Sequence, residues 1–233
     1  MLKSKVALVT GSTSGIGLGV ARALAAEGAD IMLNGFGDPA EIEKLRSGLE
    51  SEFKVKAAYF NADLSKPVET KALVEAAIAK LGKVDILVNN AGVQHVSPIE
   101  DFPPEKWELI IALNLSAAFY GTKYALPGMK ARNWGRIINI ASAHGLVASV
   151  NKAAYVSAKH GIIGLTKVTA LENAQTGITV NAICPGWVLT PLVQKQIDAI
   201  AEREKIDNTA ATRKLLGEKQ PSQQFVTIEQ VAS

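Results

Sequence analysis

The segment Val6-Ala-Leu-Val-Thr-Gly-Ser-Thr-Ser-Gly-Ile-Gly17 carries the clearest signal of the architecture of this chain. Its first five residues form a nearly continuous apolar run, which is typical of a strand buried on both faces of a parallel sheet. The glycine-rich turn that follows opens an amphipathic helical pattern, Ile16–Glu27, which ends at Gly28. A turn of this kind can hold a dinucleotide pyrophosphate at the helix N-terminus. The segment therefore predicts a dinucleotide site, although a glycine loop alone also occurs in plain turns.

Strand and helix patterns alternate along the rest of the chain. The predicted strands are Val6–Thr10, Ala29–Leu33, Lys56–Phe60, Ile86–Asn89, Arg136–Ile140 and Thr179–Ile183. The predicted helices are Ile16–Glu27, a segment that begins with Asp38-Pro-Ala-Glu41, Val68–Leu81, Glu105–Ala131 and Ala153–Gln175. Alternation with short connections predicts an α/β fold in one domain, residues 1–233, with a doubly wound parallel sheet and right-handed crossovers.

Composition and charge limit the class of protein. The chain has 233 residues, of which 48% are hydrophobic and 20% charged, as in soluble globular proteins. The net charge of +3 is small and we find no basic stripe with aromatic residues, so we expect no nucleic-acid partner. The single cysteine, Cys184, excludes an internal disulfide and favours a reducing, cytoplasmic compartment. No apolar run approaches the roughly 20 residues of a membrane span, and the N-terminus lacks a signal-peptide pattern. We expect no membrane partner and no metal ion.

Residues 188–220 depart from the regular alternation. They are helical in pattern but rich in charge, and they follow directly after the sixth predicted strand. Because this position lies beside the carboxyl ends of the strands, the segment is a candidate lid over the site. An ordinary pair of surface helices is the alternative.

The pair Tyr155 and Lys159 indicates proton chemistry. Residues four apart lie on one face of a helix, so the phenol and the ammonium are expected to be neighbours. A nearby ammonium favours the phenolate, which predicts a lowered pKa for the Tyr155 phenol. Ser142 ends the fifth predicted strand, thirteen residues before Tyr155, and can face the start of the next helix across a cleft. A lone serine at a strand end is otherwise a common turn former.

The ends of the second, third and fourth strands indicate which dinucleotide fits. Residues 31–38 contain no Lys or Arg to bind a 2′-phosphate, and Ser14 is also neutral. Phe36 would crowd a phosphate, so the sequence favours NAD over NADP. Asp63 can accept from the adenine amino group or cap a helix. The small residues in Asn89-Asn-Ala-Gly92 allow close approach of the backbone to a ligand, or form a plain turn.

These motifs resemble, in order and over nearly the whole chain, those of the short-chain dehydrogenase/reductase family. The matching residues are Thr10-Gly-x-x-x-Gly-Ile-Gly17, Asn89-Asn-Ala-Gly92, Asn114, Ser142, Tyr155-x-x-x-Lys159 and Pro185-Gly186. The resemblance implies a Rossmann-type sheet of strand order 3-2-1-4-5-6 with Tyr155 as the catalytic acid/base. It implies that Ser142 bonds the reacting oxygen, that Lys159 binds the nicotinamide ribose and that Asn114 holds a relay water. The implied cofactor-binding residues are Gly11, Thr13, Ser14, Gly15, Ile16, Gly17, Phe36, Asp63, Leu64, Asn90, Ala91, Gly92, Tyr155, Lys159, Pro185, Gly186 and Val188.

Within the family, the chain is most similar to a bacterial subgroup that interconverts D-3-hydroxybutyrate and acetoacetate with NAD, usually as a homotetramer. The resemblance rests on Asn34-Gly-Phe36, Gln94-His95, Ser142-Ala-His-Gly-Leu-Val-Ala148, Lys152, Trp187 and Gln196. It implies that the substrate is bound by Gln94, Ser142, His144, Lys152, Tyr155, Trp187 and Gln196. A cation, an imidazole and two amides would give charge-assisted recognition of one carboxylate. Plain structural alternatives, as surface or core side chains, remain open for Lys152, His144, Gln196 and Trp187.

Two alternative functions remain open from the sequence. One is a 3-oxoacyl-thioester reductase of the same family, which usually prefers NADPH. The other is a dinucleotide-binding redox sensor without turnover, which intact Tyr155, Ser142, Lys159 and Asn114 make improbable. The family pattern also continues into a last helix and a seventh strand, which are absent from this sequence. We therefore expect an exposed sheet edge, and a tetramer only if that segment is present.

Overall fold

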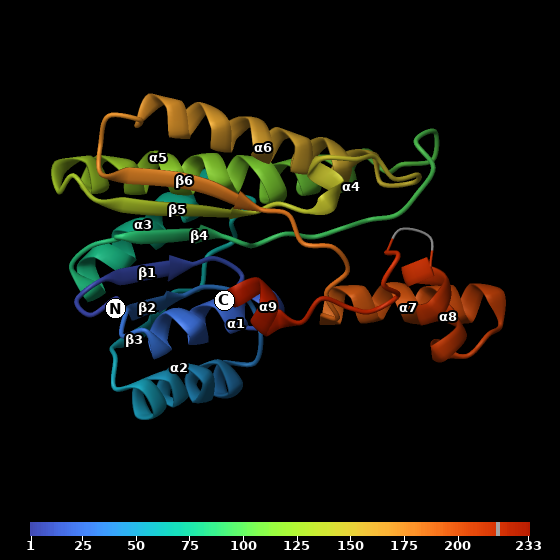
Figure 1. Cartoon of the computed structure of the whole chain (residues 1–233), viewed down its shortest axis with the longest axis horizontal. Helices are drawn as coiled ribbons and strands as arrows, with labels where there is room; N and C mark the ends of the chain where they lie inside the picture. The colour runs from blue at the N-terminus through green and yellow to red at the C-terminus, as the bar shows by residue number, and fades with distance from the viewer. Residues whose placement is uncertain (218–219) are drawn as a thin grey trace.

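The sheet of this computed structural model, which describes residues 1–217 and 220–233, has six parallel strands in the order β3-β2-β1-β4-β5-β6 (Figure 1). The strands are β1 (Val6–Val9), β2 (Asp30–Leu33), β3 (Ala57–Tyr59), β4 (Ile86–Asn89), β5 (Gly135–Ile140) and β6 (Ile178–Ile183). The predicted order is confirmed, and the chain reverses direction across the sheet between β1 and β4. Such a switch point is where ligands bind in doubly wound folds.

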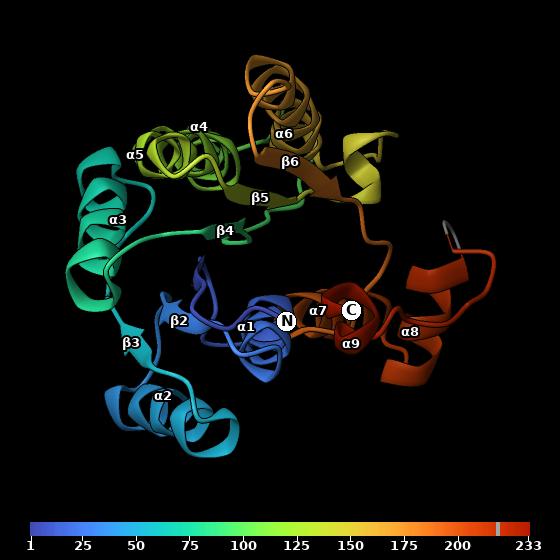
Figure 2. The same cartoon turned by 60° about the vertical axis from the view of Figure 1, so that its left-hand side comes forward.

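Helices cover both faces of this sheet (Figure 2). They are α1 (Gly15–Ala26), α2 (Pro39–Phe53), α3 (Pro67–Leu81), α4 (Pro104–Ile111), the π-helical turn η1 (Ala112–Ser116), α5 (Ala117–Ala131), the 3₁₀ turn η2 (Ala143–Gly145), α6 (Ala153–Glu172), α7 (Pro191–Glu204), α8 (Asn208–Gly217) and α9 (Ile228–Ala232). The crossovers α1 and α2 lie on one side, and α3, α5 and α6 lie on the other.

Alternating residues of the strands pack into two separate hydrophobic cores, one on each face of the sheet. The cluster beneath α3 and α5 contains Leu8, Met32, Leu87 and Ile137. The cluster beneath α1 and α2 contains Ala7, Val9, Ile31, Leu33, Ile86 and Val88. Neighbouring residues of one strand therefore enter opposite cores, because side chains alternate between the faces of a strand. This explains why the strands are almost continuously apolar in sequence.

Local signals set several helix boundaries. The Asp38 carboxylate accepts hydrogen bonds from the backbone N–H groups of Ala40 and Glu41, as its sequence context predicts. Gly82 ends α3 in a left-handed conformation with φ of 89°. The last helix before β6 was expected to reach Gln175 but ends at Glu172, where the buried Asn173 turns the chain out of the helix.

One helical run is long and apolar. By length and composition alone, the continuous run Pro104–Ala131 could span a bilayer, a test that core helices also pass. In this fold the run packs as α4, η1 and α5 against β4, β5, α3 and α6, so the same apolar composition serves the core.

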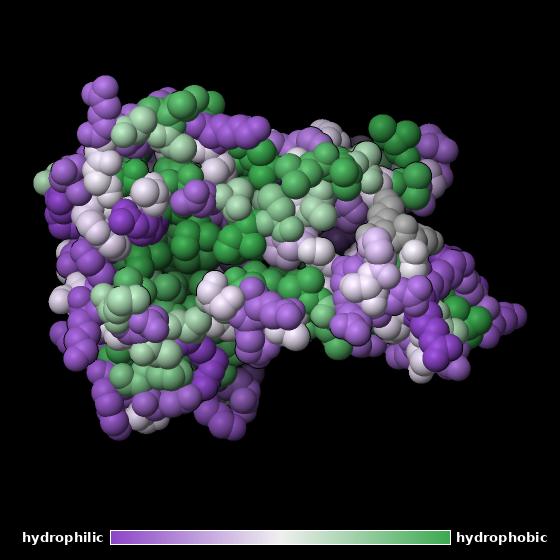
Figure 3. Space-filling view, in the orientation of Figure 1, coloured by the Kyte–Doolittle hydropathy of each residue, from purple (hydrophilic) through white to green (hydrophobic). Residues whose placement is uncertain are grey.

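The C-terminal segments lie beyond the carboxyl ends of the strands. Helices α7 and α8 pack on each other around their own apolar cluster, which includes Val193, Ile197 and Leu215 (Figure 1). The chain then returns, forms an isolated parallel bridge between Val188 and Val226, and ends with α9 against α1. In the space-filling view, green apolar residues gather over the middle of the sheet and purple hydrophilic residues dominate the outer surface of α7 and α8 (Figure 3).

Candidate active site

A large cavity of about 470 Å³ opens at the carboxyl ends of the strands, between the sheet and α7. Its volume is in the range of ligand and cofactor pockets. Its walls come from the loops after β1, β2, β4, β5 and β6 and from the first turns of α6 and α7. The topology therefore brings the motifs of distant segments to one place.

The glycine loop after β1 has the geometry of an anion cradle. Gly11 and Gly15 have φ of 60° and 55°, which other residues rarely adopt. Ser14 precedes α1 and makes no side-chain cap, so its side chain leaves the first backbone N–H groups of this helix available to a ligand. A Cβ atom at Gly17 would collide with the carbonyl of Gly11, so Gly17 serves loop packing. The loop fits a dinucleotide pyrophosphate.

The end of β2 forms a neutral wall beside this loop. Asn34 is buried, and its side-chain NH₂ donates to the carbonyls of Phe60 and Ala62. The Thr13 hydroxyl donates to the Phe36 carbonyl at 2.9 Å. A Cβ atom at Gly35 would lie 2.5 Å from that hydroxyl oxygen, so position 35 admits no side chain without a shift. Phe36 is 65% exposed and lines the cavity.

The proposed catalytic side chains meet at the inner end of the cavity. The Ser142 hydroxyl lies beside the Tyr155 phenol and favours its ionised form, and the Lys159 Nζ lies 5.5 Å from the Tyr155 ring centre. Lys159 is buried and donates to the Ile140 carbonyl at 2.7 Å. Burial lowers the pKa of Lys159 from its usual 10.5 to about 8. A phenol, a hydroxyl and an amine thus share one site.

The expected direction of the tyrosine shift was wrong for this structure. Burial raises the pKa of the Tyr155 phenol above its ordinary value, and the Ser142 hydrogen bond lowers it less. The Lys159 ammonium does not determine the pKa of Tyr155. Its Nζ donates to the Ile140 carbonyl, and burial disfavours the charged form of this lysine. Spacing predicted the proximity of the two groups, whereas their surroundings determine the sign of the shift.

Asn114 lies in the π-helical turn η1, and π-helical turns are frequent at functional sites. Its side chain pairs with the backbone of Val93 through two hydrogen bonds of 2.9 Å, one accepted and one donated. Asn114 therefore fixes the loop after β4. It does not line the large cavity but borders a separate space of about 10 Å³, together with Thr10 and Asn89. That volume is near the size of one water molecule.

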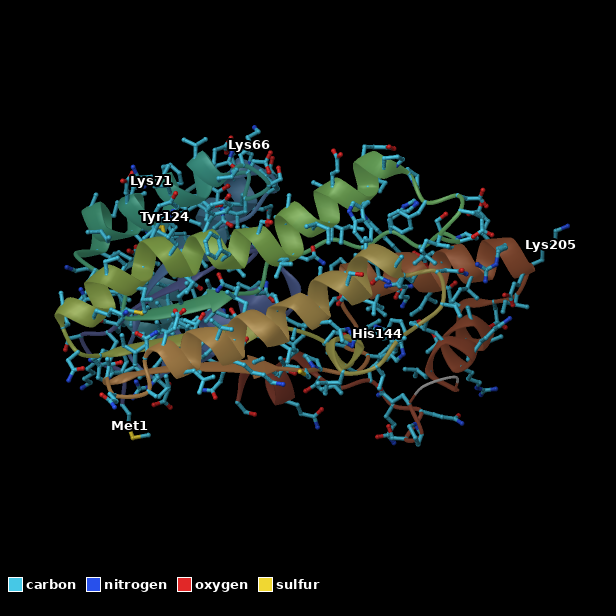
Figure 4. The ribbon with its side chains drawn as sticks, turned by 90° about the horizontal axis from the view of Figure 1, so that it is seen from above. Met1, Lys66, Lys71, Tyr124, His144 and Lys205 are labelled. Atoms are coloured by element: carbon cyan, nitrogen blue, oxygen red, sulfur yellow. The ribbon has the colours of Figure 1, made fainter. Side chains whose placement is uncertain are left out.

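Polar side chains gather at the end of the cavity nearest α7. Lys152 is buried and its Nζ lies 4.5 Å from the Trp187 ring centre. The His144 ring makes edge contacts with Tyr155 and Trp187, at centroid distances of 6.1 Å and 6.3 Å. His144 follows β5 at the end of the molecule that α7 and α8 occupy (Figure 4). The Gln94 Nε2 is buried and has no hydrogen-bond partner within residues 1–217 and 220–233.

Most predicted site residues line this one cavity. Those that line it are Gly11, Thr13, Ser14, Gly15, Ile16, Phe36, Leu64, Asn90, Ala91, Gly92, Gln94, Ser142, His144, Lys152, Tyr155, Lys159, Pro185, Gly186, Trp187, Val188 and Gln196. Gly17, Asp63 and Asn114 do not. The Asp63 carboxylate instead accepts from the backbone and hydroxyl of Ser65.

Sequence reasoning missed several lining residues. Thr190 caps α7, and its position before Pro191 is a recognisable helix start. Val147 and Leu192 add apolar surface at the mouth. Gln220 accepts from the Trp187 backbone N–H at 2.9 Å, across 33 residues of sequence, and no local pattern predicts that contact.

Comparison with known proteins agrees with this geometry. The short chain dehydrogenase family model matches residues 5–201, and the chain belongs to this family. It is an oxidoreductase with a nicotinamide dinucleotide site. It is 60% identical to a D-beta-hydroxybutyrate dehydrogenase of Cupriavidus necator, over all of this chain and 90% of the relative. It is 53% identical to a D-beta-hydroxybutyrate dehydrogenase of Rhizobium meliloti, over 99% of this chain and 89% of the relative. An actinorhodin polyketide ketoreductase solved with NADPH superposes with a TM-score of 0.91 at 37% identity, covering all of this chain and 89% of that one.

Proposed function

We propose that this enzyme interconverts D-3-hydroxybutyrate and acetoacetate with NAD. The observation that carries the proposal is that one cavity is lined by Tyr155 and Ser142, by the buried Lys152, and by Gln94, whose buried Nε2 has no hydrogen-bond partner among the described residues. The first pair suits an alcohol or carbonyl, and the second suits a carboxylate a few atoms away. The two dehydrogenases at 60% and 53% identity support the same substrate.

The proposed proton chemistry uses residues of α6 and the end of β5. Tyr155 takes the proton of the substrate hydroxyl during oxidation and returns it during reduction. Ser142, whose hydroxyl lies beside this phenol, holds the substrate oxygen in line with it. When bound, the nicotinamide dinucleotide accepts or supplies the hydride. Lys159 binds the ribose next to that ring, and Asn114 holds a relay water in the small space that it borders.

The proposed carboxylate site lies toward α7. Lys152 supplies the positive charge, and the donors of Gln94, His144 and Gln196 complete the recognition. Trp187 covers the Lys152 ammonium and packs near the methyl end of the substrate. A Lys152→Ala variant should raise the KM for 3-hydroxybutyrate and leave the KM for NAD nearly unchanged. Equal substrate KM values in the two proteins would contradict this role.

We infer NAD rather than NADP from the neutral wall at β2. The Asn34 side chain donates to a backbone carbonyl, and the Thr13 side chain leaves no room for a side chain at position 35. No Lys or Arg occurs in residues 31–38 to bind a 2′-phosphate. The ratio of kcat/KM with NAD to that with NADP should therefore strongly exceed one. A preference for NADP would contradict the inference and would favour the ketoreductase alternative, whose structural relative was solved with NADPH.

We further propose that residues 188–220 act as a lid over this cavity within one dehydrogenase domain, residues 1–233. Glu218 and Lys219 lie outside the described residues. Helices α7 and α8 have their own apolar cluster, which suits a unit that moves as one body. Gln196 and Leu192 both lie on α7 and both line the cavity. A movement of this unit would therefore also move Gln196 toward or away from the substrate.

We propose a cytoplasmic protein that forms a homotetramer when the C-terminal segment of the family pattern is present. Large apolar side chains remain exposed on the helices of one layer, namely Trp107 on α4, Phe119 on α5, and Val168 and Leu171 on α6. Exposed apolar groups of this size are typical of subunit interfaces. Native mass measurement of a protein that carries this segment should give four chains, and Leu171→Glu should shift the mass downward. A monomer of that protein at micromolar concentration would contradict the assembly but not the activity.

The deciding experiment is a screen for NAD reduction over short hydroxy acids of both configurations. We expect D-3-hydroxybutyrate to give the highest kcat/KM and its mirror image to give little turnover. Reduction of 3-oxoacyl thioesters with NADPH, without turnover of the hydroxy acid, would support the second candidate. Binding of NADH without turnover of either substrate would support a sensor.

A further inference from the structure

Asn151 stands at the turn that leads into α6, and its backbone is left-handed with φ of 61°. Glycine and asparagine adopt this conformation readily, whereas most side chains adopt it only with strain. The next residue, Lys152, is the N-cap of α6 and is buried. The turn at Asn151 therefore directs the chain so that Lys152 enters the protein interior instead of solvent.

The same residue is joined to a second loop of the site. The Asn151 carbonyl accepts a hydrogen bond from the backbone N–H of Ser97 at 2.9 Å. Ser97 lies three residues after Gln94, on the loop that leaves β4. The hydrogen bond thus connects the loop that carries Gln94 with the turn that carries Lys152, and both of these side chains line the cavity.

The chemistry of the two side chains makes their relative position important. The buried Nε2 of Gln94 has no partner among the described residues, and a buried donor without an acceptor is costly. The Lys152 ammonium lies 4.5 Å from the Trp187 ring centre, and Lys152 and Gln94 both line the cavity. One anionic acceptor can satisfy a cation and an amide together only if both are held at the correct separation.

We propose that Asn151 is a positioning residue for carboxylate recognition. Its left-handed backbone places Lys152, and its carbonyl holds the Gln94 loop against that turn. Asn151 is itself exposed and does not line the cavity, so it acts through these neighbours. This inference rests on the proposed oxidation of a hydroxy acid and assigns a cause for its carboxylate selectivity.

The test compares two substitutions that differ only in backbone preference. Asn151→Ala keeps the carbonyl but disfavours the left-handed conformation, whereas Asn151→Gly favours it. We expect Asn151→Ala to raise the KM for 3-hydroxybutyrate about 5- to 10-fold, because the competent arrangement becomes a minor state. The kcat and the dissociation constant of NADH should change less than about 2-fold, since the catalytic and dinucleotide residues lie elsewhere. Asn151→Gly should restore the native KM.

Two further measurements separate positioning from general damage. Butyrate has the carboxylate but no hydroxyl to oxidise, so its competitive inhibition constant should rise in Asn151→Ala by the same factor as the KM. The Ser97 amide should also exchange its hydrogen faster in this variant. Asn133→Ala is the matched control, because Asn133 is also left-handed, with φ of 47°, but lies at the amino end of β5. It should lower thermal stability and leave the KM unchanged.

Several results would overturn the proposal. One is that Asn151→Ala has the native KM for 3-hydroxybutyrate, or that its KM for NAD rises by the same factor. Another is that the inhibition constant of butyrate or the hydrogen-exchange rate of the Ser97 amide is unchanged in this variant. A third is that Asn151→Gly does not restore the native KM for 3-hydroxybutyrate. Failure of the underlying function is distinguishable from these results. In that case the native chain itself would not oxidise 3-hydroxybutyrate, while the Ser97 exchange rates would still report whether Asn151 holds the loop.

Discussion

The buried lysine of the site makes folding stability depend on pH in a way that can be calculated. Lys159 is buried on α6, and its pKa is lowered to about 8 from 10.5. Between these values the unfolded chain binds a proton that the folded chain has lost. The free energy of unfolding therefore rises with pH through this window. For these two pKa values, the gain between pH 7.5 and pH 9.5 is about 2 kcal/mol.

Lys159→Met removes the titrating amine and keeps a side chain of similar length. Urea denaturation, followed by tryptophan fluorescence at fixed protein concentration, gives the free energy of unfolding of both proteins at each pH. The free energy of unfolding of the native protein minus that of Lys159→Met should increase by about 2 kcal/mol from pH 7.5 to pH 9.5. Lys167→Met, at an exposed position on the same helix, should follow the pH dependence of the native chain. A parallel pH dependence of native protein and Lys159→Met would refute the reasoning.

Three other predictions follow from particular contacts. Tyr155→Phe should lower kcat about 10²- to 10⁴-fold while NADH still binds in a fluorescence titration, and near-native turnover would reject its role as acid/base. Asp38→Ala removes the α2 cap and should cost about 1 kcal/mol in urea denaturation, without changing the KM for NAD. Gly19→Ala should cost about 1–3 kcal/mol, because a Cβ atom there collides with Ile228. Amide exchange in α9 should accelerate in this variant, and native exchange rates would show that α9 does not pack as described.

Short-range patterns predicted much of the fold and of the site. The six strands and the glycine loop followed from apolar runs and turn residues, because both depend on neighbours in sequence. The strand order, in contrast, was implied by the family resemblance and is the order observed. The proximity of Tyr155 and Lys159 followed from helical spacing in the same way. The role of Asp38 as a cap could also be predicted, since its partners are two and three residues away.

Other properties depend on segments that are distant in sequence and meet only in the folded protein. Burial raises the pKa of Tyr155 and lowers that of Lys159, and no local pattern reports how much surrounding chain covers a group. The contact of Gln220 with the Trp187 backbone joins the returning chain to the loop after β6. The link between Ser97 and Asn151 joins two loops that leave different strands. Local sequence thus set which elements form, whereas long-range packing set the direction of the pKa shifts and the positions of the groups that we propose recognise a substrate.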